Sequence, residues 1–127
     1  MLFEKVSETV GFLKGKTTYR PKVAVILGSG LGDLVDYIEE QVEVDYKDIP
    51  NFPVSTVAGH AGKLVFGKIG GVEVVAMKGR FHFYEGYDMK TVTYPVFVFK
   101  QFGIEKIIVS NAAGGINRTF DPGTLMI

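Results

Sequence analysis

The 127-residue chain contains no cysteine and only two histidines. The absence of cysteine excludes disulfide bonds and thiolate metal sites. A transition-metal centre built from imidazole would need more histidines than this sequence offers. The sequence therefore predicts no metal site.

The chain also lacks an excess of charge of either sign. It has 14 basic and 14 acidic residues and a net charge of +0 at pH 7. Because nucleic-acid binding depends on a basic surface, this balance predicts no nucleic-acid partner. The apolar runs are too short to span a bilayer and no signal peptide is apparent, so we expect no membrane association and a cytoplasmic location.

The chain is organised around an apolar run at residues 23–27 that is followed by the sequence GSGLG at residues 28–32. The run predicts a strand buried on both faces, and residues 31–40 have a helix-like pattern. Glycines let a backbone approach a ligand closely, and the first amides of a helix are free to bind an anion. Ser29 adds a hydroxyl donor. An anion cradle and a plain strand-to-helix turn both fit this stretch.

Two common phosphate-binding loops do not fit the glycines. The dinucleotide fingerprint requires its third glycine three positions after the second, whereas Gly32 comes two positions after Gly30. Residues 15–17 read GKT, but the first glycine of a P-loop would fall on Val10. The cradle is therefore neither of these nucleotide sites.

Periodicity and turn residues predict the remaining elements. Apolar residues spaced by three and four indicate an amphipathic helix from residue 2 to 13, and a second helix is expected between an N-cap at Asp88 and a stop at Gly103. Strands are expected at residues 41–46, 63–69, 72–77 and 104–109, with Gly70 and Gly71 forming a tight hairpin turn. We expect one α/β domain over residues 1–127, with a mixed, largely parallel β-sheet flanked by helices on both faces.

Residues 125–127 are apolar and resemble the first part of a strand. A strand cut there leaves unpaired backbone groups and apolar side chains exposed. This pattern predicts that the chain is a fragment of a longer protein.

Polar candidates gather in the segment GRFHFYEG at residues 79–86. In an extended chain, Arg80 and His82 would point to the same side. Arginine suits bidentate capture of phosphate, and a protonated histidine adds a second charged donor. A surface loop with incidental charge is the alternative, and His60, taken alone, is more often structural than catalytic.

Four segments together resemble the trimeric class of purine nucleoside phosphorylases. They are GSGLG at 28–32, residues 57–62 around His60, GRFHFYEG at 79–86 and SNAAGG at 110–115. Their order and spacing match, and the resemblance covers essentially the whole chain. It extends over only the N-terminal half of those enzymes, which are about twice as long.

The resemblance implies phosphate-dependent cleavage of purine (deoxy)ribonucleosides to the free base and (deoxy)ribose 1-phosphate, without a metal or organic cofactor. It assigns phosphate binding to Ser29, His60, Arg80, His82 and the amide of Ala112. It assigns substrate binding to Tyr84, Asn111, Ala112, Ala113 and Gly114, and catalytic roles to His60, His82 and Glu85. The base-binding residues belong to the half that is absent. A homo-oligomer, a trimer in the family, is also implied.

Two alternatives remain open at this point. A methylthioadenosine phosphorylase would share the fold and the phosphate site, although its motifs differ from those at residues 28–32 and around Arg80. A non-catalytic anion-binding fragment or truncated gene product would keep the cradle without the chemistry. As a fragment of a phosphorylase, the isolated 127-residue chain is expected to be inactive.

Overall fold

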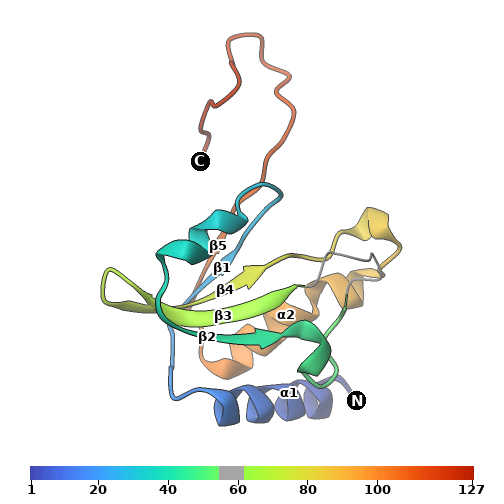
Figure 1. Ribbon diagram of the computed structural model, residues 1–127. Coiled ribbons are helices and arrows are strands. Elements are labelled where there is room, and N and C mark those ends of the chain that lie inside the picture. The colour runs from blue at the N-terminus through green and yellow to red at the C-terminus, as the bar shows by residue number, and fades with distance from the viewer. Residues whose placement is uncertain (55–61) are drawn as a thin grey trace.

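The computed structural model describes residues 1–54 and 62–127, which form a mixed five-stranded sheet (Figure 1). The strand order is β2 (Glu39–Asp45), β3 (Lys63–Ile69), β4 (Val72–Lys78), β1 (Val23–Ile26) and β5 (Lys106–Val109). β1 runs parallel to both β4 and β5, whereas β3 runs antiparallel to both β2 and β4. The predicted mixed α/β sheet is confirmed.

Two α-helices, α1 (Leu2–Lys16) and α2 (Met89–Phe102), pack on one face of this sheet (Figure 1). Leu64 and Phe66 of β3 point into this core, while Val65 between them points to the opposite face, as alternation along a strand requires. The opposite face is covered by the 3-10 helix η1 (Gly32–Tyr37), which contributes Val35 to a smaller apolar cluster. Two α-helices therefore cover one face of the sheet, and a 3-10 helix covers the other.

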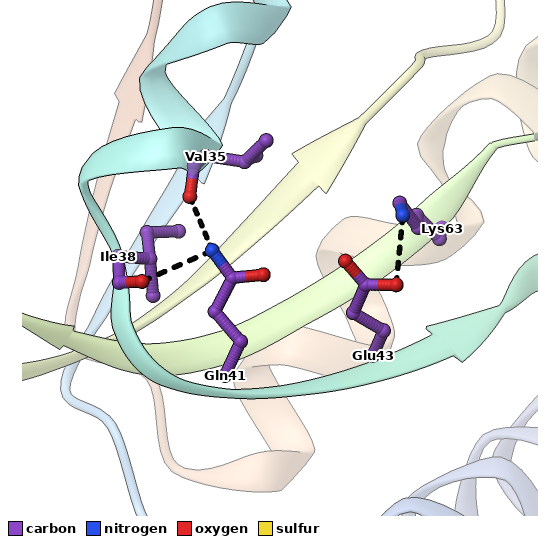
Figure 2. A network of polar contacts seen from close by, with 5 residues as sticks. All are labelled: Val35, Ile38, Gln41, Glu43 and Lys63. Carbon is purple, nitrogen blue, oxygen red and sulfur yellow. Dashed lines mark hydrogen bonds and ion pairs between the residues drawn. The ribbon is translucent and has the colours of Figure 1, made fainter.

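The helix predicted at residues 31–40 is shorter than expected and has 3-10 geometry. It ends at Tyr37 because the chain turns into β2 at Glu39. The side-chain amide of Gln41 donates to the carbonyls of Val35 and Ile38 at 2.5 and 3.0 Å, as Figure 2 shows. The Val35 carbonyl also accepts the backbone N–H of Ile38 at 3.1 Å, so Gln41 adds a second donor at the end of η1.

The hairpin between β3 and β4 is confirmed. Gly70 and Gly71 have φ values of 57° and 81°, and Ile69 pairs with Val72 across the turn. Both central positions of a type I′ turn need positive φ, which glycine adopts without strain. At the opposite end of β3, Lys63 forms an ion pair of 2.8 Å with Glu43 of β2 (Figure 2).

Both predicted ends of α2 are also confirmed. The carboxylate of Asp88 accepts a hydrogen bond of 2.7 Å from the backbone N–H of Thr91, and Gly103 ends the helix with φ of 107°. Among the described residues, no helix is long and apolar enough to cross a membrane.

The strand predicted at residues 125–127 is not formed. After β5, residues 110–127 contain only turns, bends and coil, and this segment leads away from the sheet (Figure 1). A strand needs a neighbour for its backbone hydrogen bonds, and no described strand pairs with these residues. Leu125, Met126 and Ile127 are exposed.

Candidate active site

A cavity of about 390 Å³ lies at the carboxyl ends of β1 and β4. The turn after β1 supplies one wall and the segment after β4 supplies the other. The lining residues are Leu27, Gly28, Ser29, Gly30, Gly32, Tyr46, Gly62, Gly79, Arg80, His82 and Glu85. The structure thus brings four of the candidates, Ser29, Arg80, His82 and Glu85, to one cavity.

The turn after β1 is tied to the turn after β5. A Cβ atom on Gly28 would lie 2.6 Å from the carbonyl oxygen of Ser110 and 2.7 Å from the Cα of Asn111, so only glycine permits this approach. The Gly28 N–H donates to Ser110 Oγ at 3.2 Å, and the Ser110 N–H donates to the Ile26 carbonyl at 3.0 Å. The two turns therefore form one surface.

Arg80 reaches across this surface. Its guanidinium donates to the Ser110 carbonyl at 3.1 Å and, through Nε, to His82 Nε2 at 3.4 Å. The predicted arrangement of Arg80 and His82 on the same side of the loop is confirmed. A guanidinium anchored at two points still has further N–H groups with which to bind an anion.

Glu85 holds His82 from the other side. Its Oε2 accepts a 3.1 Å hydrogen bond from the His82 backbone N–H and lies 3.5 Å from the ring Nδ1. This buried Nδ1 has no hydrogen-bond partner among the described residues. Arg80, His82 and Glu85 thus form a chain of polar groups along the cavity wall.

The other candidates lie outside this cavity or outside the described residues. Tyr84 is exposed and stacks on the His82 ring, with 4.8 Å between centroids, beside an adjoining apolar cavity. Asn111, Ala113 and Gly114 line a third cavity, and Ala112 lies between them in sequence. His60 falls outside the described residues. The roles implied for these six residues stay predictions.

Sequence reasoning missed two residues that shape the site. Tyr46 follows β2, is buried, and donates its hydroxyl hydrogen to the Gly79 carbonyl. Ser110 contacts both the Gly28 turn and Arg80. No local pattern marks Tyr46, and the SNAAGG segment marks Ser110 only as part of a turn, because each acts through partners more than 29 positions away in the chain.

The arrangement is that of an α/β protein with a cavity lined by hydrogen-bond donors at the carboxyl ends of its parallel strands. The Phosphorylase superfamily profile matches residues 22–127, and the chain belongs to this superfamily. Purine nucleoside phosphorylase 1 of Geobacillus stearothermophilus is 56% identical over 122 residues, which cover 96% of this chain and 44% of that protein. The mouse purine nucleoside phosphorylase is 52% identical, over 98% of this chain and 43% of its own length.

Solved structures of purine nucleoside phosphorylases are also similar to this chain. A purine nucleoside phosphorylase in complex with ribose-1-phosphate has a TM-score of 0.90 and 45% identity, with 94% of this chain and 44% of that chain covered. The Schistosoma mansoni enzyme in complex with inosine has a TM-score of 0.88 and 42% identity, covering 94% of this chain and 42% of that one. The present chain thus spans less than half the length of these relatives.

Proposed function

We propose that this chain forms the phosphate-binding part of a purine nucleoside phosphorylase. The single observation that carries the proposal is the convergence of the Ser29 turn, Arg80 and His82 on one cavity. The relatives support the choice of nucleoside phosphorolysis as the reaction, since one of the similar structures holds ribose-1-phosphate and another holds inosine.

The geometry supports a role for phosphate as the attacking group. Backbone amides of a glycine turn, a hydroxyl and a guanidinium are donors suited to a phosphate dianion. Phosphate would attack the anomeric carbon of the nucleoside and release the free base. Cleavage of a glycosidic bond passes through a cation-like sugar, so an anion held beside it also stabilises the transition state electrostatically. In this proposal Glu85 orients His82, and no cofactor is used besides the co-substrate phosphate.

The isolated chain is expected to bind phosphate weakly and not to turn over nucleoside. By the resemblance, the groups that bind the base lie in the half that this chain lacks. Positioning of phosphate alone supplies only part of the reduction in barrier. Incubation of the purified chain with inosine and phosphate should release no hypoxanthine above background.

A chimaeric enzyme tests the proposal directly. Residues 1–127 are joined to the part of the G. stearothermophilus enzyme that follows the matched segment, a pairing justified by the 56% identity. We expect phosphate-dependent release of hypoxanthine from inosine. Methylthioadenosine, offered in parallel, tests the alternative phosphorylase.

In this chimaera, Arg80→Ala should lower kcat/KM by about a hundredfold or more, the usual cost of removing a donor that stabilises a transition state. Arg20→Ala is the control, because Arg20 is exposed, lies outside the cavity lining, and among the described residues donates to the nearby Thr17 and Tyr19 carbonyls and lies over the Phe102 ring. A folded chimaera without phosphate-dependent base release would contradict the proposal.

Assembly and location complete the proposal. We propose a homo-oligomer, a trimer by the family resemblance, and a cytoplasmic enzyme. Sedimentation velocity of the chimaera measures the first of these, and a monomer at micromolar concentration would contradict it.

A further inference from the structure

Tyr46 is a buried residue in the wall of the candidate cavity to which the proposed reaction gives no role. It directly follows β2, and its side chain is 2% exposed. Its hydroxyl donates to the Gly79 carbonyl, and its backbone N–H donates to the Gly62 carbonyl at 3.1 Å. Tyr46 therefore joins two segments that are distant in sequence and that both line the cavity.

Both contacts are with glycines at positions where another residue would be strained or would clash. Gly79 has φ of 99° and directly precedes Arg80, so its conformation sets the direction in which the loop leaves β4. Gly62 lies so close to the Tyr46 ring that a Cβ atom there would overlap ring carbons. The tyrosine thus occupies the space between the two segments.

The ring itself is held in place. Phe52 and Phe81 pack around it with centroid distances of 5.0 and 5.3 Å. Burial raises the pKa of the Tyr46 hydroxyl far above its ordinary value, so the group stays a neutral donor at every physiological pH. A fixed ring with one neutral donor is suited to locking a loop.

We propose that Tyr46 is a positioning residue that locks the loop from Gly79, so that Arg80 and His82 face the anion cavity. Arg80 is then fixed by two contacts. The Tyr46 bond to the Gly79 carbonyl holds the backbone that precedes Arg80, and the Ser110 carbonyl accepts a hydrogen bond from its guanidinium. This inference rests on the proposed function, because it assumes that the cavity binds phosphate.

The test compares Tyr46→Phe with Tyr94→Phe in the 127-residue chain. Tyr94 is also buried, and its hydroxyl pairs with Thr9 at 2.8 Å, so the control loses a comparable bond away from the cavity lining. Both variants keep their rings and are compared at a temperature where circular dichroism shows each to be folded. NMR relaxation then reports backbone order at residues 79–82, and titration with inorganic phosphate reports affinity through the amides of residues 28–30.

We expect Tyr46→Phe to lose order at residues 79–82 and to weaken phosphate binding by roughly three- to tenfold, the range of one neutral hydrogen bond. Tyr94→Phe should lower the melting temperature to a similar degree and change neither readout. Unchanged order at 79–82 in Tyr46→Phe, or reduced order with unchanged phosphate affinity, would overturn the inference.

The two proposals fail in different ways. If the wild-type amides at residues 28–30 and 79–82 show no response to phosphate, the proposed function fails. The order of residues 79–82 in the two variants still decides whether Tyr46 locks the loop.

Discussion

Strands β3 and β5 have similar apolar sequences but opposite surroundings. Leu64 of β3 is 0% exposed, whereas Ile108 of β5 is 56% exposed. β3 has a strand on each side and apolar layers on both faces, while β5 pairs only with β1 among the described strands. Apolar sequence alone therefore does not determine burial, which also depends on what packs against each strand.

The candidate site lies across the border between these two regions. Arg80 and His82 follow β4, a buried central strand, and Ser110 follows the exposed strand β5. The bond from Arg80 to the Ser110 carbonyl links the two. A substitution in either region should thus alter the site, but only substitutions in the buried region around β3 should strongly lower the free energy of unfolding.

The largest effect is expected in the buried region. Phe66 is 1% exposed and packs on Phe102 at 5.7 Å between centroids, so Phe66→Ala should destabilise the chain by about 3–5 kcal/mol. Ile108→Ala, the matched change on β5, should cost less than about 1 kcal/mol because little surface is buried there. Urea unfolding measures both, and equal losses would contradict the contrast.

A second prediction concerns the bond between the regions. In the chimaera, Arg80→Lys should weaken phosphate binding by about 1.5–3 kcal/mol, since a single ammonium cannot replace the fork that contacts Ser110 and His82. Nucleoside binding should change less. Titration with each ligand provides the measurement, and equal losses for both would show that Arg80 is not specific for phosphate.

A third prediction tests the contact between the two turns. Gly28→Ala should cost about 1–3 kcal/mol of stability, because its methyl group would meet backbone atoms of Ser110 and Asn111. Gly11→Ala is the control: nothing lies within 4 Å of that position in helix α1, and alanine there should stabilise by about 0.5–1 kcal/mol. Thermal melts of both variants give the comparison. A neutral Gly28→Ala would mean that the two turns can separate freely.

Local signals predicted the parts of the fold that depend on local physics. The Gly70 and Gly71 turn, the Asp88 cap and the Gly103 stop each follow from the conformations that those residues favour, and each was confirmed. The Arg80 and His82 pair was predictable because alternate residues of an extended segment share a side.

Long-range contacts account for what the sequence did not show. The end of η1 is bonded to the side chain of Gln41, which lies in the next strand. The roles of Tyr46 and Ser110 depend on Gly79 and Arg80, and no periodicity places those partners beside each other. An apolar pattern also predicted a strand at residues 125–127, but a strand forms only where a neighbour supplies its hydrogen bonds.

The smallest effect is expected at Asp88, where the site loop passes into helix α2. Hydrogen bonds from the side chain and backbone of Thr91 lower the pKa of Asp88 below its ordinary value of 3.8. A carboxyl whose pKa is lower in the folded state stabilises folding above its unfolded pKa and loses that contribution as the pH falls through the folded value. Asp88→Asn keeps a capping side chain but removes the charge. The melting temperature of the wild type should therefore exceed that of Asp88→Asn slightly at pH 6, and the difference should shrink as the pH falls below 3.8 through the folded pKa and the carboxyl becomes protonated. A difference that stayed constant from pH 6 to pH 2.5 would show that the charge on Asp88 does not stabilise the helix.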